Sequence, residues 1–140
     1  MDLHTKKIVG YSFSRTMTTE LIIKALENAY HTQKPDDGLI FHSDLGTQYT
    51  SNEFSQAIDV FNMAHSFSYK GNAYNNACIE SFHAILKKEE VSLVRYIDFE
   101  SAKLALFQYI EDWYNHKRIH SRTDYKTPQE IKDIALHQSV

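Results

Sequence analysis

The sequence has little of what marks secreted, membrane-bound or nucleic-acid-coating proteins. Its single cysteine, Cys78, excludes an internal disulfide and makes a cytoplasmic location the expectation. No apolar run is long enough to cross a bilayer, and the opening MDLHTKK lacks the apolar core of a signal peptide, so no membrane partner is expected. The formal net charge of −3 argues against a dedicated nucleic-acid-coating module, which would be basic. An enzyme that holds metal ions with acids and touches DNA on one face is still compatible with that charge.

What is present describes a globular α/β domain. Hydrophobic residues make up 42% of the 140 positions, enough for a real core. Short or alternating apolar runs predict strands at 7–14, 39–44 and 65–70. Apolar side chains at helical spacing predict helices at 18–30, 51–62, 76–90 and about 99–118. Ser51 is the expected cap of the second helix, and Trp113 is among the residues that the last helix is expected to bury. A capping box, Thr127 to Glu130, predicts the start of a last helix. Because strands and helices alternate, the fold class is α/β.

Two acidic residues are candidates for chemistry. Asp44 ends a strand that is predicted to be buried, and ligands usually bind at the carboxyl ends of strands in α/β sheets. The competing interpretation is an ordinary turn aspartate before Gly46. Glu80 lies on a predicted helix, within about 20° of Lys87 and opposite the apolar stripe of that helix. Taken alone, Glu80 would be an ordinary exposed helix glutamate.

The motifs around these acids resemble a known family, the integrase-core transposases of bacterial insertion sequences. Thirty-five residues separate Asp44 from Glu80. Four stretches are similar to the family in order and spacing: DLHTKKIVGYS (2–12), HSDLGTQYTS (42–51), HSFSYKGNAYNNACIESFHAILKKE (65–89) and YNHKRIHSRTDYKTPQE (114–130). The most similar subgroup makes its transposase from two overlapping frames, of which the second encodes this core.

The resemblance implies a ribonuclease-H-like fold, as in retroviral integrases, and acid-triad (DDE) chemistry. The parent transposase would carry out metal-dependent DNA strand cleavage and strand transfer. Asp44 would be the second catalytic acid and Glu80 the third, and both would bind Mg²⁺ or Mn²⁺ in a two-ion site. Lys87 would contact a DNA phosphate, and Arg118 and His120 would also bind DNA. The implied partners are insertion-sequence ends, target DNA and further copies of the chain in a homo-oligomer.

The family's first acid has no counterpart in this sequence. Asp2 matches a hairpin-turn aspartate of the family instead, so we do not count it as catalytic. The resemblance therefore implies a fold truncated at the N-terminus, with the first strand missing, and a chain that is inactive alone. Whether the chain is itself an enzyme stays open. All of residues 1–140 would belong to the C-terminal portion of the integrase catalytic core, with about 1–110 forming the ribonuclease-H-like part and about 111–140 a basic helical tail.

Two alternatives stay open at this point. One is a non-catalytic protein, either a relic of a decayed element or a fragment that binds full-length transposase and inhibits it. The other is an ordinary nuclease of the same fold, against which the C-terminal motif and the 35-residue spacing argue. A missing first strand would also leave the strand at 39–44 with a free apolar edge, which predicts a dimer with exchanged or joined strands.

Overall fold

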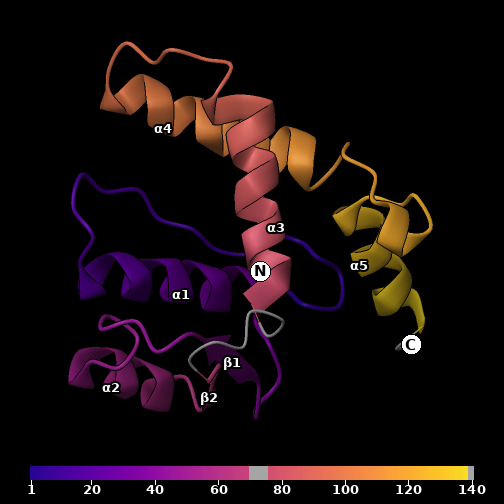
Figure 1. Ribbon diagram of the computed structural model, residues 1–140. Coiled ribbons are helices and arrows are strands. Elements are labelled where there is room, and N and C mark those ends of the chain that lie inside the picture. The colour runs from indigo at the N-terminus through magenta and orange to yellow at the C-terminus, as the bar shows by residue number, and fades with distance from the viewer. Residues whose placement is uncertain (70–75, 139–140) are drawn as a thin grey trace. The chain divides into compact units, whose positions relative to one another are not determined.

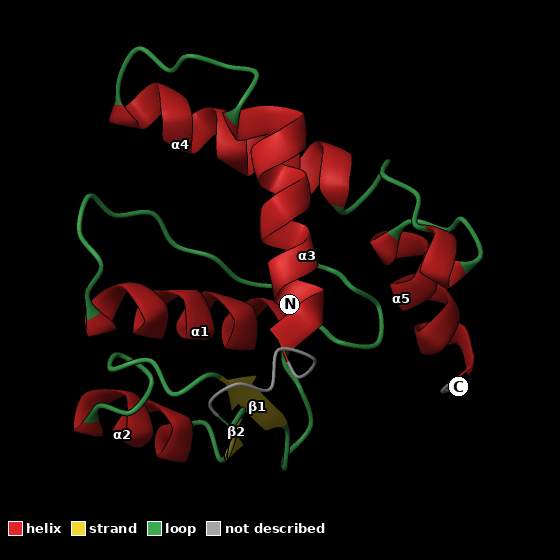
Figure 2. Cartoon of the chain, viewed as in Figure 1, coloured by secondary structure: helices red, strands yellow, loops and turns green. Residues whose placement is uncertain are grey.

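The computed structural model describes residues 1–69 and 76–138 (Figures 1 and 2). Residues 70–75, which belong to the third of the sequence motifs, lie outside the described residues. None of the helices in the described part is long and apolar enough to cross a membrane. In chain order the main elements are α1 (Thr19–Gln33), β1 (Ile40–Ser43), α2 (Asn52–Val60), β2 (Ala64–Phe67), α3 (Ala77–Leu86), η2 (Lys87–Val91), α4 (Phe99–Gln108), η3 (Tyr109–Tyr114), η4 (Ser121–Thr123) and α5 (Pro128–Gln138).

The chain divides into two compact units. Val9–Glu80 forms the central unit, and Met1–Ile8 joins Ser81–Val140 in the C-terminal unit. The central unit contains both described strands together with α1 and α2, whereas the C-terminal unit is helical. The division at about residue 110 that the resemblance implied stays a prediction.

The central unit is built on a parallel pair of strands. β1 and β2 align Ile40 with Ala64 and Ser43 with Phe67, and α2 provides the connection that two parallel strands need. The predicted Ser51 cap is confirmed, because its side chain accepts a hydrogen bond from the backbone N–H of Phe54. The buried core consists of Leu26, Phe54 and Ile58. Helices α1 and α2 therefore pack through their apolar sides, as the helical spacing predicted.

The strand predicted at 7–14 does not form. Residues 7–14 have no regular secondary structure, and the two-stranded pair of β1 and β2 is the one sheet within residues 1–69 and 76–138. Instead, the segment passes very close to α1: a Cβ on Gly10 would lie 2.4 Å from the Ala25 carbonyl oxygen and 2.6 Å from the Ala29 Cβ. The alternating pattern was real, but a strand also needs a hydrogen-bonding neighbour.

The C-terminal unit contains the two long helices predicted at 76–90 and about 99–118. Both are confirmed, and both change from α-helix to π-helix in their second part, at η2 and η3. The predicted Thr127 capping box is also confirmed, since the Glu130 side chain accepts from the Thr127 N–H at 2.7 Å and the Glu130 N–H donates to Thr127 Oγ1 at 3.2 Å. Trp113 was expected to be buried and is not, because 47% of its surface is exposed.

Asn115 ties the N-terminal segment to this helical unit. Its side chain is fully buried, accepts from the Ile8 N–H at 2.9 Å and donates to the Ile8 carbonyl at 3.0 Å. An asparagine amide thus supplies both hydrogen bonds that a neighbouring strand would have given to Ile8. Asp2 lies in the turn just before, where its carboxylate accepts from the backbone N–H groups of His4 and Thr5. This is the turn role expected for Asp2.

Candidate active site

Asp44 lies where β1 ends, as predicted. Its side chain is exposed, and Oδ1 accepts one hydrogen bond, from the Gly46 N–H at 2.9 Å. Burial raises the pKa of the Tyr49 hydroxyl, and the negative charge of Asp44 raises it further, which places that carboxylate near the ring. Within the described part of the chain, no other hydrogen bond or ion pair reaches the Asp44 side chain. Its second oxygen has no partner among the described residues.

Polar side chains on both faces hold the last residues of β1. On one face, the two ring nitrogens of His42 contact Ser66 Oγ at 3.0 Å and Ser68 Oγ at 2.8 Å, both from the segment of β2. On the other face, Ser43 Oγ donates to the Asp44 carbonyl at 2.9 Å and contacts His65 Nε2 at 2.9 Å.

The two contacts of Ser43 also fix the tautomer of His65. A hydroxyl has one proton, and Ser43 gives it to the carbonyl of Asp44, so His65 Nε2 must carry a hydrogen and donate it. His42, Ser43, His65, Ser66 and Ser68 all lie in stretches that resemble the family, but the sequence predicted no role for them. Strand alternation alone could have shown that neighbouring strands bring these polar side chains together in pairs.

Glu80 and Lys87 are both exposed on the continuous helix formed by α3 and η2. Among the residues that the structure describes, neither side chain makes an ion pair or hydrogen bond. Their predicted placement on one side of a helix is compatible with this exposure. The convergence of the Asp44 and Glu80 carboxylates on one ion stays a prediction.

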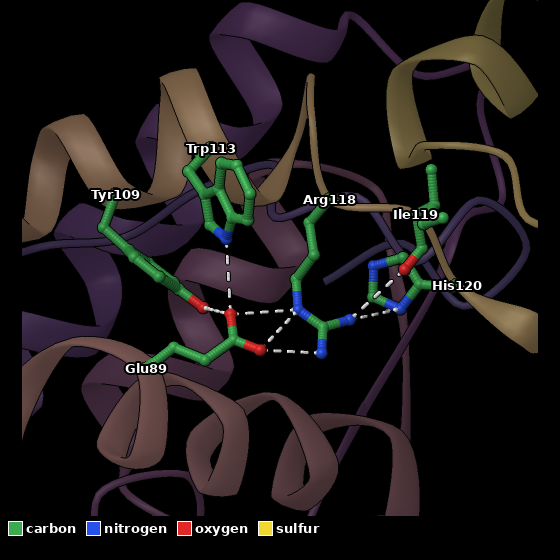
Figure 3. A network of polar contacts seen from close by, with 6 residues as sticks. All are labelled: Glu89, Tyr109, Trp113, Arg118, Ile119 and His120. Atoms are coloured by element: carbon green, nitrogen blue, oxygen red, sulfur yellow. Dashed lines mark hydrogen bonds and ion pairs between the residues drawn. The ribbon is translucent and has the colours of Figure 1, made fainter.

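A third carboxylate, Glu89, is fully engaged. Its two oxygens accept from the Tyr109 hydroxyl at 2.7 Å, from Trp113 Nε1 at 3.3 Å and from Arg118, whose Nη2 lies 2.8 Å from Oε1 (Figure 3). Hydrogen bonding from Arg118 is the main reason why the pKa of Glu89 falls from 4.5 to about 2. Burial and the hydrogen bond to Glu89 raise the pKa of Tyr109 in turn.

The sequence interpretation missed Glu89 as a functional candidate. Glu89 is the last residue of the motif at 65–89, but the sequence predicted no role for it. Helical spacing could have identified it, because Glu89 follows Phe82 by seven positions and would share its side of a regular α-helix. A glutamate on an apolar side predicts a buried or partly buried partner of opposite charge.

The two tail residues predicted to bind DNA lie beside this glutamate. The Arg118 side chain is 22% exposed and forms an ion pair with Glu89. His120 Nδ1 lies 3.4 Å from Arg118 Nη1, its ring packs edge-on against Tyr114, and its Nε2 is buried without a partner within the described residues. Burial, and then the charge of Arg118, lower the pKa of His120. DNA contact by Arg118 and His120 stays a prediction.

Asp44 and Glu80 are chemically suited to a hard divalent cation, but two acids are fewer than the three of the acid triad. Carboxylate oxygens are the donors that Mg²⁺ and Mn²⁺ prefer, and both Asp44 and Glu80 have oxygens that no described residue occupies. Within the described residues, 1–69 and 76–138, no three His, Cys, Asp or Glu side chains form a group that could hold a metal ion.

Comparisons with solved structures show the fold. A chain of the simian T-cell lymphotropic virus intasome, solved in complex with PP2A regulatory subunit B56 gamma, matches 84% of this chain and 41% of its own length, with a TM-score of 0.64 and 20% identity. The catalytic core domain of BIV integrase matches 87% of this chain and 75% of its own, with a TM-score of 0.55 and 18% identity. The predicted α/β, ribonuclease-H-like fold of retroviral integrases is thus confirmed.

Comparisons of sequence point to mobile elements. The transposase for insertion sequence element IS904 of Lactococcus lactis is 38% identical over 132 residues, which cover 94% of this chain and 52% of that protein. Transposase InsF for insertion sequence IS3A of Escherichia coli K12 is 35% identical over 136 residues, 97% of this chain and 47% of InsF. The chain thus spans about half the length of the curated relatives it matches.

Two family descriptions divide the sequence between them. Residues 1–73 and residues 80–136 each match a family described as "Integrase core domain". The first match includes Asp44 and the β1–β2 pair, and the second includes Glu80, Lys87 and the Glu89 network. The chain belongs to the integrase core domain family of the insertion-sequence transposases.

Proposed function

We propose that the chain is the C-terminal part of a DDE transposase core that cuts and joins insertion-sequence DNA. The observation that supports this most directly is the contrast among its carboxylates. Glu89 is saturated by three donor side chains, whereas Asp44 and Glu80 are exposed and keep oxygens free of described partners. Those two acids lie at the positions that match the catalytic acids of a family whose relatives are transposases, and their free oxygens suit a metal ion.

Asp44 and Glu80 would hold Mg²⁺ or Mn²⁺. When bound, such ions activate the attacking oxygen and stabilise the leaving oxygen in phosphodiester displacement. The residues of this chain contribute orientation: the Gly46 N–H holds one oxygen of Asp44, and the His42 contacts to Ser66 and Ser68 hold the end of β1. Because two carboxylates clamp ions less well than three, we expect weak metal affinity for residues 1–140.

Lys87 is the residue we propose to contact a DNA phosphate, since its ammonium group is exposed and unpaired within the described residues. We also propose that DNA binding involves the basic tail around Arg118 and His120. Arg118 could reach a phosphate only by exchanging its ion pair with Glu89 for that contact. The single cysteine supports a cytoplasmic location for this activity.

Manganese titration of the chain tests the shared metal site. We expect Asp44→Asn and Glu80→Gln each to lower Mn²⁺ affinity, measured by electron paramagnetic resonance, and the double variant to lose little more than either single one. Glu53→Gln, which changes an exposed glutamate in the first turn of α2, is the control and should bind as the parent does. Independent, additive losses would show that the two carboxylates do not share an ion.

A strand-transfer assay tests the contribution of residues 1–140 to catalysis. With Mn²⁺ and a duplex carrying an element end, we expect these residues alone to give no detectable joining, because the site has two of the three acids. Robust joining that disappears in Asp44→Asn would show that two acids are sufficient, and the ligand count argued here would be wrong.

We also propose that the chain pairs with other copies of itself, and the sheet supports this proposal. β1 and β2 form a two-stranded sheet within the described residues, so each strand has one edge that no described strand covers, and Ile40 on β1 is 66% exposed. Such an edge is a template for another chain. We expect a homodimer in light scattering over a concentration series. A monomer at every concentration would rule out this mode of pairing.

A further inference from the structure

The helix that carries Glu80 and Lys87 has two opposite sides. η2 begins at the residue after α3 ends, so Ala77 to Val91 is one continuous helix. At the 100° per residue of α3, about 200° separates Glu80 from Phe82, and Lys87, the first residue after α3, lies about 20° from Glu80. Phe82 and Glu89 share the other side, because both contact residues of η3. Burial follows this division: Phe82 is 5% exposed, whereas Glu80 and Lys87 are exposed.

Both residues of the inner side are anchored within the C-terminal unit. The Phe82 ring packs edge-on against Tyr114, with ring centroids 4.8 Å apart. Two turns further on, Glu89 accepts hydrogen bonds from Tyr109, Trp113 and Arg118 (Figure 3). One apolar contact and one charged network, seven residues apart on the same side, are enough to fix how the helix is rotated about its axis.

The charged network also joins two π-helical segments. Bonds between residues five apart occur in both helices: Ser92 N–H donates to the Lys87 carbonyl at 2.8 Å, and Asn115 N–H donates to the Ile110 carbonyl at 3.0 Å. π-Helical turns are rare and occur often at functional sites. A π-turn changes the direction of every side chain that follows it, so the position of Glu89 depends on the segment that it helps to hold.

We propose that Glu89 is a positioning residue for Glu80 and Lys87. With Phe82, it fixes the rotation of the helix, so that the side bearing Glu80 and Lys87 stays free for metal and phosphate. This inference rests on the proposed function, which assigns the metal role to Glu80 and the phosphate role to Lys87. It gives Arg118 a second role besides the DNA contact predicted from the sequence, as the cation that holds Glu89 in place.

Spin labels test the positioning without reference to DNA or metal. Nitroxides would be attached to Lys87→Cys and Lys103→Cys after Cys78→Ser; Lys103 lies exposed on α4, in the same unit as Glu89. We expect a narrow distance distribution in pulsed electron paramagnetic resonance and a clearly broadened or shifted one after Glu89→Ala. Glu27→Gln, an exposed change on α1, is the control and should leave the distribution narrow.

An unchanged distribution in a folded Glu89→Ala protein would overturn the proposal. If the alanine variant does not fold, Glu89→Gln takes its place, because glutamine keeps the size and one acceptor oxygen and loses only the charge. The same reading applies to it: broadening supports the positioning role, and an unchanged distribution contradicts it.

A double-mutant cycle of Lys87 and Glu89 then tests whether the position of Lys87 affects DNA binding. The affinity of each variant for a fluorescently labelled DNA duplex is measured. We expect Lys87→Ala to weaken binding about three- to tenfold in the parent and to reduce the salt dependence by about one ion. In the Glu89→Ala background the same change should cost less than about twofold, since Lys87 is no longer held in place.

The two experiments fail in different ways. If Lys87→Ala has no effect in the parent while the spin-label distances broaden, the phosphate role of Lys87 is wrong and the positioning by Glu89 stands. If Lys87→Ala weakens binding equally in both backgrounds, Glu89 does not position Lys87, and the proposed DNA contact stands without it.

Discussion

Glu80 and Glu89 lie on the same helix, nine positions apart, and have opposite surroundings. Glu89 accepts hydrogen bonds from three side chains and has a pKa of about 2, whereas Glu80 is exposed and unpaired within the described residues. A carboxylate already saturated by a guanidinium, a phenol and an indole has no oxygen to offer to a metal ion. A carboxylate without hydrogen-bond or ion-pair partners contributes little to folding, but its oxygens can still bind a ligand.

The comparison separates stability from function on one helix. Substitutions on the side of Phe82 and Glu89 should lower the free energy of unfolding. Substitutions on the side of Glu80 and Lys87 should leave it unchanged and should affect binding instead. Trp113 is the one tryptophan of the chain and contacts Glu89, so its fluorescence follows unfolding of the C-terminal unit.

The largest expected effect is that of Phe82→Ala. The ring is 5% exposed and contacts Tyr114, so its removal leaves a cavity that the surrounding side chains cannot fill completely. We expect a loss of about 3–5 kcal/mol in the free energy of unfolding. Urea denaturation followed by Trp113 fluorescence measures it, and Ala84→Gly on the exposed side of α3, which costs only about 1 kcal/mol of helix propensity, is the control. Equal losses for both would contradict the division into two sides.

A smaller effect is expected from Glu89→Gln. The amide keeps one acceptor oxygen for Tyr109 or Trp113 but loses the ion pair with Arg118. Because the pair is partly exposed, we expect a loss of about 1–3 kcal/mol at pH 7. The same denaturation experiment measures it, with Glu27→Gln as the matched control. A stability within about 0.5 kcal/mol of the parent would mean that the network contributes nothing to folding.

The pH dependence of stability tests the difference between Glu89 and an ordinary exposed glutamate. The pKa of Glu89 is lowered from 4.5 to about 2 by the hydrogen bond from Arg118, so the ionised form stabilises the fold above pH 4.5. This stabilisation is lost as the pH falls from about 4.5 towards 2. Between pH 6 and pH 3, we expect the parent to lose about 1 kcal/mol more than Glu89→Gln does. Parallel pH profiles for the two proteins would show that Glu89 titrates normally.

The smallest effect on stability is expected from Glu80→Gln and Lys87→Ala. Both side chains are exposed and unpaired within the described residues, so each change should alter the free energy of unfolding by less than about 0.5 kcal/mol. Glu80→Gln should still weaken Mn²⁺ binding, and Lys87→Ala should weaken DNA binding. Destabilisation by more than about 1 kcal/mol would mean that these side chains make packing contacts. It would contradict the division of the helix into a stabilising side and a binding side.

Local patterns predicted most of the elements and caps. The Ser51 and Thr127 caps and the helices at 18–30, 51–62, 76–90 and 99–118 follow from side-chain spacing and short-range hydrogen bonds, and the structure confirms them. The strand at 7–14 was wrong because a strand depends on a partner elsewhere in the chain, and Ile8 finds its partner in the side chain of Asn115. The free carboxylates Asp44 and Glu80 were found from spacing and motif, although their convergence stays a prediction.

The sequence by itself determined the family, the positions of the two candidate acids and the two-sided helix that carries Glu80 and Lys87, because periodicity and motif order are properties of the chain alone. The tertiary structure decided which polar groups neutralise one another. Glu89 meets Arg118 across 29 positions, and His42 meets Ser66 and Ser68 across neighbouring strands. Such contacts depend on how distant elements pack, and packing is what distinguishes the acid that holds the fold from the acids that stay free to bind.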